Sequence, residues 1–181
     1  MRSVNSTPRC TLALAACALA LSAAAPAAAL EPRREHAQDA MDMGRAKSDI
    51  RGFQDAVLGA RAESLTGLKE VKRDGDDTWY VRPADKLAWE DIPLTSITYV
   101  THKGTIVEIE VATAMDRMPR VLEALTAAYG MPFTGRSGKS WERAGNRVVM
   151  SAEGGKGTVR FIEGRLRDEM HRDREARAKP K

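Results

Sequence analysis

Cysteine is nearly absent from this sequence, and its absence limits the chemistry open to the protein. The only two cysteines, Cys10 and Cys17, lie within residues 1–29. The rest of the chain therefore has no disulfide, no thiolate metal ligand and no cysteine nucleophile. Its stability has to come from packing and hydrogen bonding.

Histidine is also scarce, with three residues in the chain. His36, His102 and His171 fall in a polar N-terminal stretch, a predicted turn and a charged C-terminal stretch, with no shared spacing. A histidine zinc site or a Ser-His-Asp arrangement needs such groups to be brought together. The sequence therefore predicts neither, and we expect no cofactor.

Glycine-rich nucleotide motifs are missing as well. Residues 138–140 (Gly-Lys-Ser) resemble the end of a phosphate-binding loop, but the glycine required five positions before Gly138 is Phe133. The segment is also expected to lead into a strand instead of a helix. Residues 154–157 (Gly-Gly-Lys-Gly) are interpreted as a hairpin turn, because no helix start follows that could hold an anion.

Acidic residues form two small groups, and neither has a catalytic or metal-binding pattern. Asp74, Asp76 and Asp77 lack the alternating ligands and the final glutamate of a calcium loop, so they are interpreted as turn residues. Glu108 and Glu110 share one face of a predicted strand, and two carboxyl groups can act as acid and base. A solvated sheet face is the favoured interpretation, with a carboxylate enzyme site as the alternative.

The longest apolar run lies near the N-terminus and is typical of an export signal. Arg2 and Arg9 precede a nearly unbroken apolar stretch at 11–25, and three alanines at 27–29 precede Leu30. A basic head, an apolar middle and a small-residue exit are what translocation and signal cleavage require. The sequence therefore predicts cleavage after Ala29 and a periplasmic or secreted protein.

A lipoprotein signal is the alternative, since residues 14–17 (Leu-Ala-Ala-Cys) would make Cys17 an acylated first residue. The apolar segment before Cys17 would then span only 11–16, which is short against the roughly 7–15 residues that such regions have. A transmembrane anchor is disfavoured, because Pro26 interrupts a run that is shorter than the roughly 20 residues of a span. We expect membrane contact only if Cys17 is lipidated.

The composition divides the chain into four parts. We predict a signal peptide at 1–29, a polar leader or weak helix at 30–51, one domain at 52–164, and a charged tail at 165–181 that is partly helical or disordered. Losing Arg2 and Arg9 lowers the formal net charge from +4 to +2. The basic character of the whole chain thus gives little support to a nucleic-acid partner.

The domain alternates between strand and helix patterns. Strands are predicted at 68–73 and 78–82 around an Asp-Gly turn, at 94–101 and 105–112 around residues 102–104, and at 140–143, 147–152 and 158–162. One helix is predicted at 116–129, with Asp116 as its cap, Pro119 in its first turn and Gly130 as its stop. Its apolar stripe centres on Leu125 and should cover the sheet. The fold class is α+β in two layers, with an antiparallel hairpin sheet that is wet on one face.

Between residues 52 and 162 the chain carries an ordered set of short motifs. They are Gly52-Phe53, Gly59, Tyr80-Val81-Arg82-Pro83, Asp85-Lys86-Leu87, Ile97 and Tyr99, Gly104, Tyr129-Gly130 with Pro132, Trp141 and Gly157-Thr158. The set resembles a family of small exported bacterial proteins of unknown function. The resemblance implies export and a fold of this kind, and it implies no catalytic residue.

Two features remain as candidate contacts. Trp89 lies beside acidic residues in the connection between the first two hairpins, where it is either a partner contact or a core side chain. The tail has seven basic and four acidic residues, a net charge of +3, and its acid-before-base pairs favour a solvated helix. Weak polyanion binding is its alternative role, and we expect deletion of 168–181 to leave the melting temperature nearly unchanged.

These patterns favour an exported binding or envelope-accessory module without catalytic activity, whose partner is another envelope protein. An enzyme with a carboxylate site at Glu108 and Glu110 and a polyanion-binding tail are the competing hypotheses. Nucleic acid is disfavoured as a partner.

Overall fold

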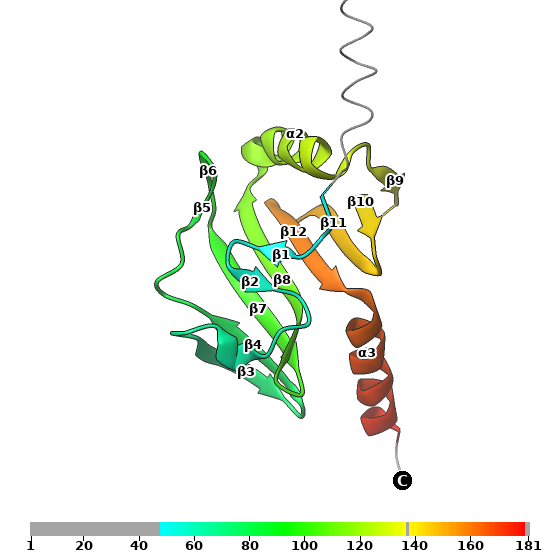
Figure 1. The fold of residues 1–181 in the computed structure, drawn as a ribbon. Coiled ribbons are helices and arrows are strands. Elements are labelled where there is room, and N and C mark those ends of the chain that lie inside the picture. The colour runs from blue at the N-terminus through cyan, green and yellow to red at the C-terminus, as the bar shows by residue number, and fades with distance from the viewer. Residues whose placement is uncertain (1–47, 137, 180–181) are drawn as a thin grey trace, which may run out of the picture. The chain divides into compact units, whose positions relative to one another are not determined.

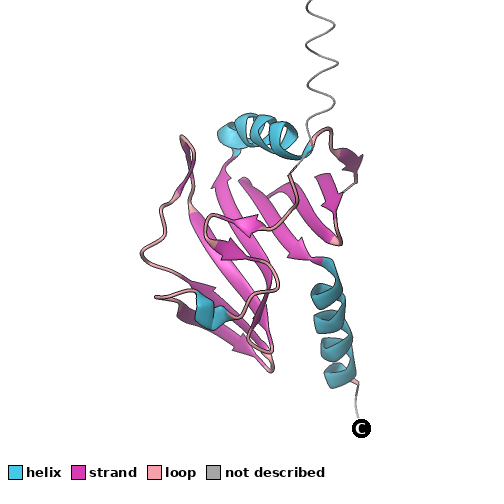
Figure 2. Cartoon of the chain, in the orientation of Figure 1, coloured by secondary structure: helices cyan, strands magenta, loops and turns pink. Residues whose placement is uncertain are grey.

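The structure is a computed structural model that describes residues 48–136 and 138–179. The predicted signal peptide and most of the predicted leader lie outside the described residues. The domain is α+β, with an antiparallel sheet, a helix α2 (Met118–Tyr129) and a C-terminal helix α3 (Gly164–Ala178) (Figure 1). Figure 2 shows how much of the domain is strand. In spatial order the sheet contains β3 (Lys69–Asp74), β4 (Asp77–Val81), β7 (Ser96–His102), β8 (Thr105–Ala114), β12 (Lys156–Glu163), β11 (Asn146–Glu153), β10 (Gly138–Arg143) and β9 (Phe133–Gly135).

The predicted hairpins are confirmed. β3 and β4 pair across the Asp-Gly turn, with Asp74 opposite Asp77. β7 and β8 pair around Lys103 and Gly104, and β10, β11 and β12 form a meander that returns beside β8. Turn residues that adopt positive φ at little cost therefore set most of the strand order.

One face of the sheet carries the main hydrophobic core. The chain segment before β3 and helix α2 cover this face, and Val121 and Leu125 of α2 are fully buried against it. The helix begins at Met118 after a 3₁₀ turn (Met115–Arg117), so the prediction that Asp116 caps it is wrong. Pro119 does lie in its first turn, where the missing N–H is not needed.

The other face is not wet as predicted, because α3 packs on it. Tyr99 of β7 belongs to the main core, whereas its neighbour Val100 packs with Val107 and Met170 of α3 in a second cluster. Successive strand residues point to opposite faces, so the two clusters lie on opposite sides of the sheet. A register shift in the β7–β8 pair lets both Val107 and Glu108 contact α3. The sheet is therefore packed on both faces at this end.

Two small hairpins extend the first face. The hairpin of β1 (Gly52–Phe53) and β2 (Ala56–Val57) lies over the sheet, and that of β5 (Ala88–Trp89) and β6 (Ile92–Pro93) rises beside α2 (Figure 1). The compact domain starts before residue 52, because Ile50 is buried in the main core and its carbonyl accepts a hydrogen bond from Asn146.

Candidate functional site

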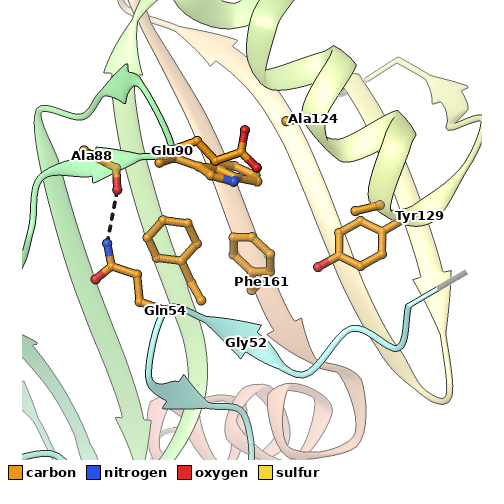
Figure 3. Close-up of a pocket in the computed structure, with 10 residues that line it drawn as sticks. Gly52, Gln54, Ala88, Glu90, Ala124, Tyr129 and Phe161 are labelled. Carbon is orange, nitrogen blue, oxygen red and sulfur yellow. Dashed lines mark hydrogen bonds between the residues drawn. The ribbon is translucent and has the colours of Figure 1, made fainter.

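A groove opens between the β5–β6 hairpin and helix α2. Its volume is about 340 Å³. Figure 3 shows the floor formed by Phe161 of β12, with Tyr129 of α2 on one side and the β5 segment on the other. The lining residues are Gly52, Phe53, Gln54, Ala88, Trp89, Glu90, Ala124, Ala128, Tyr129 and Phe161. Four separate segments of the chain thus meet at one site.

Local backbone geometry places the β1 side of the groove. Gly52 has a φ of +149°, and a Cβ on it would lie 2.0 Å from the carbonyl oxygen of Ala56, so only glycine permits this hairpin. Gln54 follows with a φ of +53°, and its side-chain amide donates to the carbonyls of Lys86 and Ala88 at 2.8 and 3.3 Å. These bonds fix β1 against β5.

Three aromatic rings pack together at the base of the groove. The centroids of Phe53 and Trp89 lie 5.3 Å apart in an edge-to-face arrangement, and Phe53 and Phe161 lie 5.5 Å apart. Such pairs add stabilisation beyond burial alone. Phe53 and Phe161 are buried, whereas Trp89 is half-buried and keeps part of its surface free for contact.

Polar groups lie at the rim. Glu90 is exposed at the β5–β6 turn, and the neighbouring Asp91 forms an ion pair with Arg120 of α2 that ties the two sides of the groove together. Tyr129 directs its hydroxyl toward Phe161 (Figure 3), and burial raises the pKa of this phenol. The groove is thus apolar inside, with an acidic group at its edge.

Of the two interpretations of Trp89, the structure shows the packing against the core, and the partner contact stays a prediction. Trp89 packs against the core rings and also lines the groove. Sequence reasoning missed Tyr129 and Phe161 as its neighbours, because they come from a helix and a strand far along the chain. The sequence signal for this groove was an aromatic residue beside acidic residues in a short connection.

The two glutamates of β8 do not form an acid–base pair at a cleft. Glu108 is buried beneath α3, and Arg167 Nη1 lies 2.7 Å from its Oε2 without hydrogen-bond geometry. Burial raises the pKa of Glu108, which the positive charge of Arg167 only partly opposes. The predicted solvated face is therefore wrong at Glu108. Neither Glu108 nor Glu110 lines the groove.

His102 and Asp77 flank the predicted hairpin turns, at the end of β7 and the start of β4, and both are buried in an ionic cluster. His102 Nδ1 lies 2.6 Å from Asp77 Oδ1, and His102 Nε2 lies 3.1 Å from Asp173 Oδ2 of α3. Arg174 Nε donates to Asp77 at 2.6 Å. Both ring nitrogens face carboxylates, so the ring has no nitrogen left to activate a nucleophile. Together with Glu169, His102 and Asp173 are the described residues that can hold a metal ion.

The charged tail is a helix that faces inward with several of its basic residues. Arg167 contacts Glu108, Arg174 pairs with Asp77, and Arg177 pairs with both Asp76 and Asp77. Met170 is fully buried. The predicted helix is confirmed, but one face of it packs on the domain instead of being solvated. These three arginines are engaged by the domain itself, which weakens the polyanion hypothesis.

Residues of the exported-family pattern serve packing around one ion network. Arg82 pairs with Asp55 and Asp85, and the hydroxyl of buried Tyr99 donates to Asp85 at 2.8 Å. Burial raises the pKa of Tyr99, so its phenol stays protonated as a donor. These residues hold β4, β7 and the β1–β2 hairpin together.

The glycine motifs are structural, as interpreted from the sequence. Gly138 starts a strand, and a Cβ on it would lie 2.1 Å from the carbonyl oxygen of Met150 on β11. Gly154 and Gly155 form the turn between β11 and β12 with positive φ. Neither segment leads into the N-terminus of a helix.

The described residues form a small α+β domain with an aromatic-lined groove. Within residues 48–136 and 138–179, neither helix is long and apolar enough to cross a bilayer. Comparison of the chain with family models, with curated proteins and with solved structures finds no match. The resemblance to an exported family therefore stays a prediction.

Proposed function

We propose that the protein is an exported, non-catalytic binding module whose partner is another envelope protein, and that the groove around Trp89 is its contact site. The observation that carries this proposal is the convergence of Phe53, Trp89, Tyr129 and Phe161 on one open cavity. The export part rests on the N-terminal sequence pattern alone.

The size and lining of the groove suit one or two inserted side chains. Its volume of about 340 Å³ lies at the lower end of ligand pockets. Tryptophan and tyrosine are enriched among residues that dominate binding energies, because they offer large contact area with few rotatable bonds. A partner's apolar side chain over Phe161, with Glu90 orienting a neighbouring polar group, fits this lining.

Exposed apolar side chains just after α2 favour a protein partner over a small molecule. Met131 is 86% exposed, and Phe133 is 75% exposed on β9, the strand at one end of the sheet. Large exposed apolar side chains on an edge strand are unfavourable in isolation and are commonly covered by another chain. Both follow Tyr129 closely in sequence, so the contact surface can extend from the groove along this segment.

The charges at the groove favour binding over catalysis. Glu90 is the only carboxylic acid among its lining residues, and it is exposed at the rim. Acid–base catalysis by carboxylates needs two groups whose environments separate their pKa values. The carboxylate pair of the enzyme hypothesis, Glu108 and Glu110, lies away from the groove, and Glu108 is covered by α3.

Photo-crosslinking in the producing cell tests the contact site. A photoreactive phenylalanine analogue replaces Glu90 at the rim of the groove, and in a matched control it replaces Val71 on β3, which is also exposed. We expect one specific adduct with an envelope protein from position 90 and none from position 71, because β3 lies at the opposite end of the sheet from β9.

A second change shows whether the groove itself makes the contact. Adding Trp89→Ala to the chain with the crosslinker at 90 should abolish the adduct, while adding Val71→Ala should leave it intact. Circular dichroism of both chains checks that the domain remains folded. Equal adducts at positions 90 and 71, or an adduct that survives Trp89→Ala in a folded chain, would contradict the proposal.

A further inference from the structure

The cluster where α3 meets the β7–β8 hairpin has the layout of a metal site. His102 is the last residue of β7, and Glu169 and Asp173 lie one helical turn apart on α3. Their ligand atoms all lie within 4.8 Å of one another. One imidazole and two carboxylates are ligands that zinc commonly uses, with water completing a tetrahedral site.

The contact between His102 and Asp173 needs either a hydrogen-bonding proton or a metal ion between the two atoms. A neutral imidazole that donates its Nδ1–H to Asp77 presents a lone pair at Nε2. The nearest atom of Asp173 is a carboxylate oxygen at 3.1 Å, which also carries lone pairs. Two acceptors at this separation repel, so either a proton or a metal ion has to join them.

The separation matches a shared metal as well as a shared proton. Two ligands about 2.0–2.2 Å from one tetrahedral Zn²⁺ lie about 3.4 Å from each other. The observed 3.1 Å between His102 Nε2 and Asp173 Oδ2 needs only a small opening. Asp77, which is fully buried, holds the ring from the other side at 2.6 Å, as carboxylates do behind zinc-bound histidines.

A cation already lies on the two carboxylates. Lys103 Nζ is 2.8 Å from Asp173 and 2.9 Å from Glu169. Lys103 lies in the turn after β7 with a half-exposed side chain, so it can withdraw into solvent without disturbing the sheet. Arg174 and Arg177 are directed at Asp77 instead and balance that buried charge.

We propose that His102 Nε2, Glu169 and Asp173 form a binding site for a divalent transition metal, Zn²⁺ in the first place, and that the ammonium of Lys103 is its competitor. Imidazole nitrogen with carboxylate oxygen selects such a metal over Mg²⁺ or Ca²⁺, which prefer oxygen ligands alone. The bound ion would tie α3 to the hairpin. This inference is independent of the groove.

Calorimetric titration of the full exported chain with ZnCl₂ tests the site. All variants carry His36→Ala, so that the leader histidine cannot act as a ligand. We expect one Zn²⁺ per chain for the otherwise unchanged protein, tighter binding for Lys103→Ala, and loss of binding for His102→Gln and for the pair Glu169→Gln with Asp173→Asn. Asp77→Asn should weaken Zn²⁺ binding roughly 10- to 100-fold, because residues that hydrogen-bond to a metal-binding histidine orient its ring and tune its basicity.

Two further measurements distinguish metal binding from an effect on folding. Glu175→Gln, an exposed position on the same helix, is the matched control and should bind Zn²⁺ normally. Co²⁺ in place of Zn²⁺ should give the visible absorption of a tetrahedral site in the unchanged protein and in Lys103→Ala. Circular dichroism monitors α3 in each variant.

Three results would overturn the proposal. The first is no Zn²⁺ binding in the unchanged protein, even if Lys103→Ala gains it, since the lysine would then exclude the metal from the natural site. The second is binding that survives in a folded chain with Glu169→Gln and Asp173→Asn. The third is equal binding to Ca²⁺, which would show a general acidic surface.

Discussion

At the scale of single residues, two buried acids under α3 show how hydrogen bonds decide the effect of burial. Burial alone would raise the pKa of Asp77, but hydrogen bonds from Arg174 and His102 outweigh it and hold that pKa below its usual value. Glu108 has a nearby charge without a hydrogen bond, and burial raises its pKa. Burial also lowers the pKa of its partner Arg167. The Asp77 contacts therefore stabilise α3 more than the Glu108 pair does.

Changing the Glu108 pair tests this difference. Arg167→Met alone should lower the free energy of unfolding by roughly 3 kcal/mol, because it leaves a buried charge without its counterion. Glu108→Gln together with Arg167→Met should leave it unchanged or raise it by about 1–4 kcal/mol, since both desolvated charges are removed. Urea unfolding of the two variants at neutral pH gives the comparison. A double variant less stable than Arg167→Met would show that the pair is net stabilising.

The pair of Glu108 and Arg167 also determines in which direction pH changes the free energy of unfolding. Because the folded protein raises the pKa of Glu108, the folded state holds this proton more tightly than the unfolded state does. The contribution to stability is fully present below the unfolded value of about 4.3 and is lost as pH rises through the folded pKa. Arg167→Met should enlarge this loss, because it removes the charge that opposes the raised pKa of Glu108, and the double variant should remove the loss. Urea titrations across this range measure both effects.

At the scale of elements, α3 is the part of the fold that sequence patterns misjudge. Its sequence is dominated by charged residues and carries no clear apolar stripe, so its period predicts a solvated helix. The structure docks it through one buried methionine and through charges that meet partners on β4, β7 and β8. Such docking depends on pairs far apart in sequence, such as Asp77 with Arg174, and no local pattern reveals them.

Met170, the buried apolar side chain of a mostly charged helix, should therefore contribute strongly to the free energy of unfolding. Met170→Ala should cost about 2–5 kcal/mol, because it removes a fully buried side chain from contact with Val100 and Val107. Met131→Ala, at a methionine that is 86% exposed, is the matched control and should change stability by less than about 0.5 kcal/mol. Urea unfolding measures both.

Removal of 168–181 should also destabilise the domain, in contrast to the expectation from sequence. The deletion takes away buried Met170 and the two arginines, Arg174 and Arg177, that pair with buried Asp77. A melting temperature that stays the same after this deletion would mean that α3 does not contribute to the stability of the folded domain.

At the scale of the whole molecule, the sequence predicts the sheet well and the site poorly. Alternating residues and turns such as Asp74–Asp77 are local, so the hairpins and the helix around Leu125 could be predicted. The groove could be predicted only at Trp89, because Phe53 and Phe161 reach it through tertiary packing. The cluster at His102 was missed for the same reason, since its carboxylates come from a helix about seventy residues later.

The processing of the chain is the remaining property of the whole molecule, and it decides where the groove and α3 operate. We expect the exported protein to begin at Leu30, because the apolar run before Ala29 is long enough for a cleaved signal and the run before Cys17 is too short. The intact mass of protein recovered from the envelope and medium measures this directly, and Cys17→Ser is the control that should leave the mass and the location unchanged. A mass that corresponds to a diacylated Cys17, lost in Cys17→Ser, would place the domain at a membrane surface. The proposed partner would then be sought among proteins on the same membrane, because a lipid anchor confines both binding surfaces to its vicinity.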